Sequence, residues 1–333
     1  MKIHYLFQKV VKIMLDTSVV DDLTIRMTNS CNLCCPYCFA SSNTEPTDQQ
    51  LSVDEIKAAI EKINPVRIGI SGGEPLLRHD DVMDLLKYCY DRNDLRRRVR
   101  VETNGTLPFD FDTLASYADD KYAIQFATSL DGFEEFNDSR RGEGSFQKTS
   151  EFAKQAVEHG FFTIIKATVE DDIFVDNLDY YYDFIKYCRN ELGVHRCRIG
   201  TVKDAGRATE YISNVKQQNG NLDLMIHAFG QCRNLQHKFY EETGYKFDNG
   251  EALVDFVDVA TCITCGRTRE SNARNALHLG TDGLVYMGCA FVNVPICHWT
   301  KFTPEVNRKA RFLFDRMEIG AKDGIVKRVD RLW

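Results

Sequence analysis

No stretch of this 333-residue sequence is apolar for long enough to cross a membrane as a helix. A spanning helix needs about 18 or more predominantly apolar residues. The first residues, MKIHYLFQKVVKIMLDTS, include apolar side chains, but Lys9 and Lys12 interrupt them. That run is too short and too broken for a signal peptide. We therefore expect a cytoplasmic protein without a membrane partner.

Positive charge is not in excess either. The 42 Lys and Arg residues against 49 Asp and Glu give a formal net charge of −7. This argues against nucleic acid or an anionic membrane as the main partner. Cysteine, at 12 residues, is too sparse for a disulfide scaffold. In a reducing compartment, clustered cysteines indicate metal binding rather than disulfides.

Short β-rich runs alternate with amphipathic helical stretches along the first two thirds of the chain. In one of these stretches Ser52 and Glu55 form a predicted capping box at the start of a helix. Such alternation implies parallel strands with right-handed crossovers. The predicted strands span 22–28, 66–71, 98–103, 123–130, 162–169 and 196–202, and the predicted helices 52–63, 80–90, 111–118, 145–160 and 177–192.

Six such units predict an α/β fold, a partial (β/α)6 barrel related to the TIM barrel, whose functional residues lie at the C-terminal ends of the strands. The pattern changes after about residue 205, and cysteines and glycines return from residue 255. We expect an N-terminal extension (1–20), a core barrel (21–210), a helical connector (211–254) and a small cysteine-rich domain (255–333).

Unusual residues follow successive predicted strands. Gly-Gly, Asn-Gly and Asp-Gly are common turn formers, so each pair taken alone favours a turn. Together, at the ends of neighbouring parallel strands, they would line one mouth of the barrel. Cys31 to Cys38 follow the first strand, Gly72, Gly73 and Glu74 the second, Asn104 the third, Ser129 and Asp131 the fourth, and Gly206 and Arg207 the sixth.

Four cysteines fall within the run SCNLCCPYCF, residues 30–39. They form either two abutting CxxC units or one CxxxCxxC made by Cys31, Cys35 and Cys38. Cys34 and Cys35 are consecutive, so their side chains diverge in an extended loop. Zinc-binding CxxC pairs are normally about a dozen or more residues apart. Three thiolates on a 4Fe–4S cube leave one iron open for chemistry. The spacing therefore favours the three-cysteine cluster.

CxxxCxxC after a first strand, with Tyr37 just before the last cysteine, resembles the radical S-adenosylmethionine (SAM) enzymes. The resemblance extends to SGGEP, ETNGT, SLDG and GRA, and so covers residues 20–210. It implies that the three cysteines bind three irons and that SAM chelates the fourth. An electron from the cluster would cleave SAM to methionine and a 5′-deoxyadenosyl radical, which takes a hydrogen atom from the substrate.

The same resemblance implies a set of SAM-binding residues around the mouth of the barrel. An arginine there suits the methionine carboxylate, because a guanidinium pairs well with a carboxylate. The implied contacts are Tyr37 near the adenine, Gly72 and Gly73 along the methionine moiety, Glu74 at its ammonium group, Ser129 at the ribose or carboxylate, Arg141 at the carboxylate, and Asn104 and Asp131 at other polar groups.

Four more cysteines, Cys262, Cys265, Cys289 and Cys297, lie near the C-terminus. Four thiolates can close one cluster or one zinc site, and the spacing leaves both open. The segment LHLGTDGLVYMGC predicts a β-hairpin. It resembles the hairpin in the SPASM and twitch extensions of radical SAM enzymes, which hold auxiliary 4Fe–4S clusters. Cys297 is inferred as the fourth ligand from its proximity, with Cys232 as the substitute.

The resemblance implies an oxidoreductase that modifies a peptide or a small molecule and takes electrons from a donor such as flavodoxin or ferredoxin. A sugar or aminocyclitol dehydrogenase or epimerase is an alternative. A zinc-stabilised binding protein on a barrel scaffold is an alternative from another class. Ala290 follows Cys289, where sulfatase-maturing relatives carry Asp, so we do not expect that activity.

Overall fold

The structure, a computed structural model, describes residues 20–43, 45, 50–92, 98–202, 206–214, 222–243, 254–257, 276–287 and 294–309. The strands are β1 Asp22–Arg26, β2 Arg67–Ser71, β3 Val99–Thr103, β4 Ile124–Ser129, β5 Phe162–Val169, β6 Arg196–Thr201, β7 Val254–Val257, β8 Ala276–Leu279, β9 Leu284–Met287 and β10 Val294–His298. The helices are α2 Val53–Ile63, α3 His79–Asp91, α4 Phe111–Tyr117, α5 Glu134–Arg141, α6 Ser145–Glu158, α7 Asp171–Asp176, α8 Leu178–Asn190, α9 Arg207–Asn214 and α10 Leu222–Thr243, with short 3-10 turns at Pro75–Arg78, Lys121–Ala123 and Trp299–Lys301.

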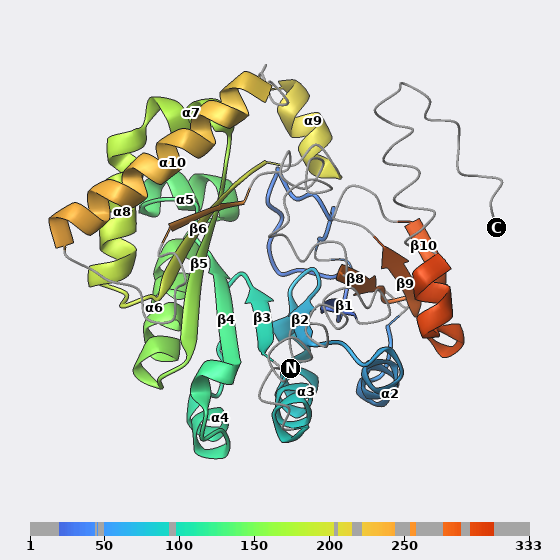
Figure 1. Cartoon of the computed structure of the whole chain (residues 1–333). Coiled ribbons are helices and arrows are strands. Elements are labelled where there is room, and N and C mark those ends of the chain that lie inside the picture. Colours follow the sequence, from blue (N-terminus) through green and yellow to red (C-terminus); the bar gives the residue numbers. More distant parts are fainter. Residues whose placement is uncertain are drawn as a thin grey trace, which may run out of the picture.

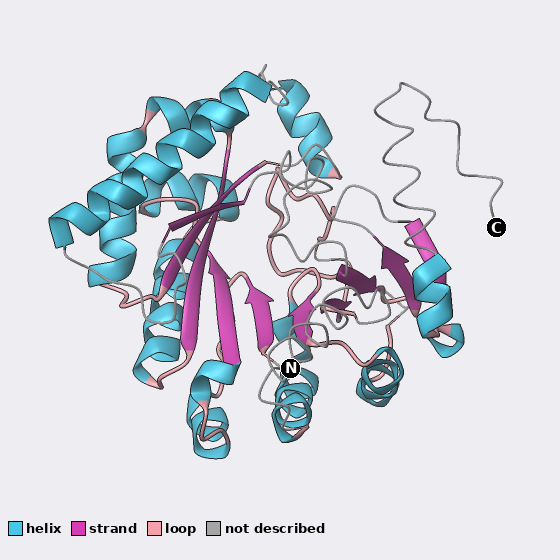
Figure 2. Cartoon of the chain, viewed as in Figure 1, coloured by secondary structure: helices cyan, strands magenta, loops and turns pink. Residues whose placement is uncertain are grey.

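One curved sheet organises the molecule. Its strand order is β10-β9-β8-β1-β2-β3-β4-β5-β6-β7, and β1 to β7 run parallel in sequence order. Helices surround the outer face of this sheet (Figures 1 and 2). The α/β class and the partial barrel are thereby confirmed. Among the described helices, none combines the length and the apolar character that crossing a bilayer requires.

The alternation of side chains along β1 explains how the barrel is built. Leu23, Ile25 and Met27 are fully buried in the core that the outer helices cover. Thr24 and Arg26 point the other way and line the interior of the barrel. Successive strand residues face opposite sides of a sheet, so an apolar outer layer leaves a polar inner wall.

Local chemistry sets the helix boundaries where the sequence predicts them. Ser52 Oγ accepts a hydrogen bond from Glu55 N at 3.3 Å, and Glu55 Oε2 accepts one from Ser52 N at 2.9 Å. This capping box starts α2, and such a cap contributes about 1 kcal/mol. Asn64 ends the helix in the left-handed conformation, with φ of 52°.

The C-terminal hairpin continues the barrel sheet. β8 pairs in parallel with β1, and β9 and β10 extend it in antiparallel order. The predicted hairpin is therefore present, but it shares one sheet with the barrel. β7 adds a seventh parallel strand beyond the six expected. Its four residues are too few to give a readable periodicity.

Candidate cluster and cofactor site

The loop after β1 presents its four cysteines unequally. Cys31, Cys35 and Cys38 are partly buried, whereas Cys34 is exposed. Burial raises the pKa of Cys31 to about 11 and also raises that of Cys35. Metal ligation requires thiolates, so binding iron would have to displace these protons. The exposure agrees with the predicted trio, in which Cys34 takes no part.

No three His, Cys, Asp or Glu side chains of the described residues gather closely enough to hold a single metal ion. The cysteines of a 4Fe–4S cube each bind a different iron. Ligation by the trio stays a prediction, and the chemistry of its three thiols on one loop fits such a cluster.

Arg207 ties the cysteine loop to the start of α9. Its backbone N–H donates to Cys38 O at 3.1 Å, and its Nε and Nη2 donate to Cys35 O at 3.1 and 3.0 Å. A Cβ on Gly206 would lie 2.4 Å from Phe39 O, and Gly206 has φ of 61°. The Gly-Arg pair that follows β6 therefore fixes the loop backbone, a role that the sequence did not reveal.

Gly72 and Gly73 let the end of β2 approach the chain that leads into the cysteine loop. A Cβ would lie 2.7 Å from Thr28 O at Gly72 and 2.1 Å from Ser30 O at Gly73. Gly73 N donates to Thr28 O at 2.7 Å, and Glu74 N donates to Ser30 O at 2.9 Å. The close approach of the Thr28–Ser30 backbone thus leaves no room for a side chain at either glycine. Their predicted approach to SAM stays a prediction.

Glu74 lies behind the mouth of the barrel and is fully buried. Its carboxylate accepts from Thr103 Oγ1 at 2.7 Å, Leu76 N at 3.0 Å and Asn104 N at 2.7 Å. Burial raises its pKa to about 7. These bonds join the start of the turn after β2 to the loop after β3. The predicted contact of Glu74 with the methionine ammonium group stays a prediction.

Asn104 connects that loop with the first cysteine. Its Nδ2 donates to Asn32 Oδ1 at 2.8 Å and lies 3.8 Å from Cys31 Sγ. An N–H directed at a ligating sulfur is one means by which proteins tune iron–sulfur clusters. Asn104 was predicted to contact SAM, and the structure places it beside the cysteine.

Asp131 is a second buried acid, at the end of β4. It accepts from Arg141 Nη2 at 2.7 Å, Arg140 Nε at 3.3 Å, Thr168 N at 2.9 Å and the Tyr37 hydroxyl. Burial acts to raise its pKa, but the two guanidinium groups hold the pKa below its usual value. Asp131 is 0% exposed among these protein partners, and its predicted contact with SAM stays a prediction. It joins Tyr37 and Arg141, two other predicted SAM residues.

Arg140 extends this network and was missed in the sequence. It pairs with the buried Glu170 at 2.7 Å, which also accepts from Tyr211 OH at 2.5 Å. Its guanidinium lies 4.2 Å from the centre of the Tyr37 ring, a cation–π arrangement. The run DSRRG contains both arginines, but only packing shows which groups they pair with. Ser129, half-buried at the end of β4, donates to Thr103 O at 3.5 Å.

Of the four predicted auxiliary-cluster cysteines, the structure describes Cys297. It lies on β10, half-buried, in register with Val285 of β9. Cys262, Cys265 and Cys289 lie outside the described residues, as does the side chain of Cys232. The auxiliary ligand set therefore stays a prediction.

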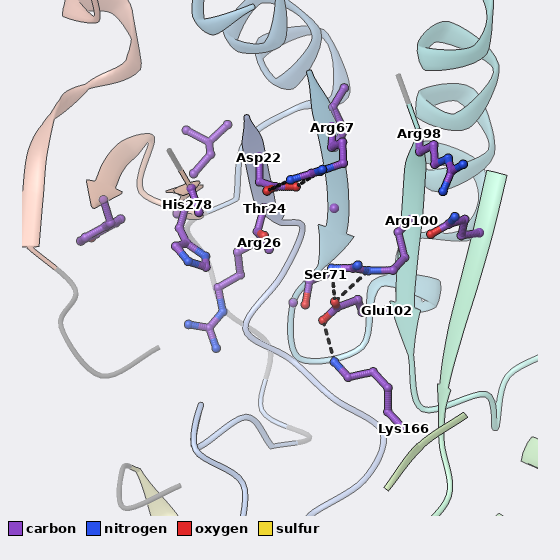
Figure 3. Close-up of a pocket in the computed structure, with 18 of the residues that line it drawn as sticks. Asp22, Thr24, Arg26, Arg67, Ser71, Arg98, Arg100, Glu102, Lys166 and His278 are labelled. Carbon is purple, nitrogen blue, oxygen red and sulfur yellow. Dashed lines mark hydrogen bonds and ion pairs between the residues drawn. The ribbon is translucent and has the colours of Figure 1, made fainter. Parts of the chain in front are cut away.

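The barrel interior holds a cavity of about 910 Å³. Its wall is formed by inward-facing side chains of β1 to β6 and of the β8–β9 hairpin (Figure 3). Asn29, beside the cysteine loop, donates to Thr281 Oγ1 of the hairpin turn at 3.1 Å. The cysteine loop and the C-terminal hairpin thus border the same cavity, whose size is near the upper end of ligand pockets, roughly 300–1,000 Å³.

Residues 25–175 match the model of the Radical SAM superfamily. An AdoMet-dependent heme synthase of Oleidesulfovibrio alaskensis is 32% identical over 193 residues, which are 55% of this chain and 46% of the relative. The sporulation killing factor maturation protein SkfB of Bacillus subtilis is 26% identical over 230 residues, 68% of this chain and 52% of the relative. The chain thus spans about half the length of these curated relatives.

Among solved structures, Streptococcus suis SuiB bound to its precursor peptide SuiA superposes with a TM-score of 0.63. The match covers 91% of this chain and 68% of SuiB at 16% sequence identity. At that identity the likeness concerns the fold alone. It extends beyond the residues that match the family model.

Proposed function

Since this chain belongs to the radical SAM superfamily, we propose that it oxidises or crosslinks a peptide by radical chemistry. The radical SAM domain implies a 4Fe–4S cluster and SAM as cofactors. The observation that carries the proposal is the trio Cys31, Cys35 and Cys38 on a loop that Arg207 fixes beside Asn104. Bound to Cys31, Cys35 and Cys38, the cluster would supply the electron for reductive cleavage of SAM, and SAM would supply the radical that takes a hydrogen atom from the substrate.

The chain's own residues hold the parts in place. Glu74 and Asn104 join the ends of β2 and β3 to the cysteine loop, and Asp131 anchors Tyr37 within it. Tyr37 is 6% exposed. The contact of its ring with the adenine of SAM remains our proposal. Arg141 and Ser129 remain our proposed contacts for the SAM carboxylate or ribose. The other proposed SAM contacts are Gly72 and Gly73 along the methionine moiety, Glu74 at its ammonium group, and Asn104 and Asp131 at other polar groups.

A peptide is the favoured substrate. One relative is a maturation protein for a killing factor, and a solved structure of the same fold holds a precursor peptide. The heme synthase relative supports a small molecule as the second candidate, which includes the sugar or aminocyclitol dehydrogenase alternative. A cytoplasmic location with a flavodoxin or ferredoxin as electron donor belongs to the same proposal.

We further propose that Cys262, Cys265, Cys289 and Cys297 hold an auxiliary 4Fe–4S cluster of the twitch type. In support, the β8–β9 turn that contains Thr281 borders the cavity next to the cysteine loop, and β10, which carries Cys297, pairs with β9. An auxiliary cluster there could take up an electron from a substrate radical. The division into core barrel, connector and auxiliary region remains part of this proposal.

Anaerobic reconstitution with iron and sulfide, followed by reduction with SAM present, tests the proposal. We expect a brown protein with about eight irons per chain, four per cluster, and formation of 5′-deoxyadenosine. Fewer than about four irons together with no 5′-deoxyadenosine would contradict it. A colourless protein with stoichiometric zinc would favour the binding-protein alternative instead.

A further inference from the structure

Positive charge gathers on the inner wall of the barrel, although the chain as a whole carries a net charge of −7. Among the described residues that line the cavity, seven are Lys or Arg and three are Asp or Glu. Apolar side chains are few on this wall, because the inward positions of β1, β3 and β6 are polar. The charge of the described cavity wall is thus positive, whereas the net charge of the whole chain is negative.

Two of the three acids are already engaged with cations of the wall. Asp22 and Arg67 form a two-point ion pair, with N–O distances of 2.7 and 2.5 Å. Glu102 is shared by Arg100 at 2.8 Å and Lys166 at 3.2 Å. Figure 3 shows this Arg100–Glu102–Lys166 chain across β3 and β5. One carboxylate between two cations leaves positive charge in excess.

The electrostatics at Lys166 reflect that excess. Glu102 acts to raise the pKa of Lys166, but burial and the charges of Arg100 and Arg198 together bring it below its usual value. The ammonium and guanidinium side chains of this group remain about one-third exposed, at 34% for Lys166 and 33% for Arg100. They can therefore meet a ligand that enters the cavity.

Arg26 is not part of the Arg100–Glu102–Lys166 network. It is the last residue of β1, and its guanidinium extends into the cavity (Figure 3). It forms no ion pair with any residue that the structure describes. Burial lowers the pKa of its guanidinium, and the Cys38 thiol and the Tyr286 hydroxyl act to raise it. A partly buried guanidinium next to the cysteine loop is suited to a two-point contact with a carboxylate.

We infer that the barrel interior binds an acidic segment of the peptide substrate, with Asp or Glu carboxylates paired to Arg26 and to the Arg100–Lys166 group. This inference rests on the proposed function, since it names the chemistry of the peptide. Ion pairs formed in a confined, partly dehydrated cavity are stronger than pairs in bulk water. The net negative charge of the chain disfavours long polyanions such as nucleic acid. A short acidic segment can instead enter the cationic cavity without lying along the negatively charged exterior.

Binding of labelled peptides to the reconstituted holoenzyme with SAM tests this inference by fluorescence anisotropy. The probes are an Asp/Glu-rich peptide, its Asn/Gln counterpart of the same length, and free glutarate as a competitor. We expect the acidic peptide to bind at least about tenfold more tightly than the neutral one, with the difference shrinking at high salt. Arg26→Gln should remove about tenfold of that affinity and Arg26→Lys should restore most of it. Lys148 is exposed on α6 and lies outside the cavity, so Lys148→Gln should change the affinity for neither peptide.

Equal binding of the two peptides, or an equal loss for both in Arg26→Gln, would overturn the inference. So would displacement of the acidic peptide by glutarate at a concentration matched for carboxylate, because the site would then accept a small dicarboxylate. Formation of 5′-deoxyadenosine is measured in the same samples. Its absence contradicts the proposed function, whereas its presence in Arg26→Gln shows that the variant is folded and loaded.

Discussion

Cys34 differs from the three cysteines around it in that its side chain is exposed, while theirs are partly buried. We predict that Cys34→Ala keeps the first cluster and SAM cleavage, because it removes a thiol that faces solvent. Cys35→Ala should lose both, since it removes one of three ligands. Iron content and 5′-deoxyadenosine yield measure the two effects. Equal losses in the two variants would show that the trio is the wrong one.

Glu74 gives a pH dependence to stability that can be worked out in sign. Its pKa is about 7 in the folded chain, against an ordinary value of 4.5. The folded state therefore holds the proton more tightly, and this stabilisation is complete below about pH 4.5 and is lost as pH rises through about 7. The part lost between pH 6 and pH 8 is about 1.4 kcal/mol in the free energy of unfolding.

Urea unfolding of the reconstituted chain at pH 6 and pH 8 measures that loss. Glu74→Gln cannot titrate, so we expect its free energy of unfolding to change less between the two pH values. If Glu74→Gln loses as much stability as the native chain between pH 6 and pH 8, a group other than Glu74 causes the loss.

At the scale of elements, α5 is held to the end of β4 by charge. Its Arg140 and Arg141 both contact Asp131, whose side chain is 0% exposed. Asp131→Asn leaves two buried cations short of a carboxylate, which we expect to cost about 3–5 kcal/mol of stability. The matched change Asp112→Asn removes a carboxylate that is 95% exposed beside His159, and should cost less than about 1 kcal/mol. Chemical unfolding of the two variants compares them, and similar costs would contradict this account.

Elements with a strong hydrophobic period were predictable from sequence, whereas α5 was not. The strands β1 to β6 and helices such as α2 start and end within a few residues of prediction, because apolar spacing and the Ser52 cap define them. α5, with the sequence EEFNDSRR, is almost entirely polar and has no such period. The cysteine trio is predicted from its spacing, and its ligation of a cluster stays a prediction. The partners of Glu74 and Asp131 depend on how strand ends pack together, which spacing does not encode.

At the scale of the whole molecule, the C-terminal hairpin and the barrel share one hydrophobic core. Leu277 and Leu279 of β8 are 0% exposed and belong to the same buried cluster as Leu23 and Ile25 of β1. We predict that Leu277→Ala costs about 2–5 kcal/mol and destabilises the barrel as a whole. Far-UV circular dichroism and the fluorescence of Trp299, measured in a Trp333→Phe background, should report the same unfolding midpoint. Two separate midpoints would mean that hairpin and barrel unfold independently.

The parallel pairing of β1 with β8 also bears on the order in which the chain folds. The contact between Asn29 and Thr281 joins residues 252 positions apart. Closing so long a loop costs conformational entropy before the contact can stabilise the fold, and contacts between residues far apart in sequence slow folding. During synthesis, β1 can pair with β2 early but gains its second neighbour only after the hairpin has left the ribosome. The wall around the cysteine loop is therefore completed late, so iron is expected to enter this site after translation has passed residue 281.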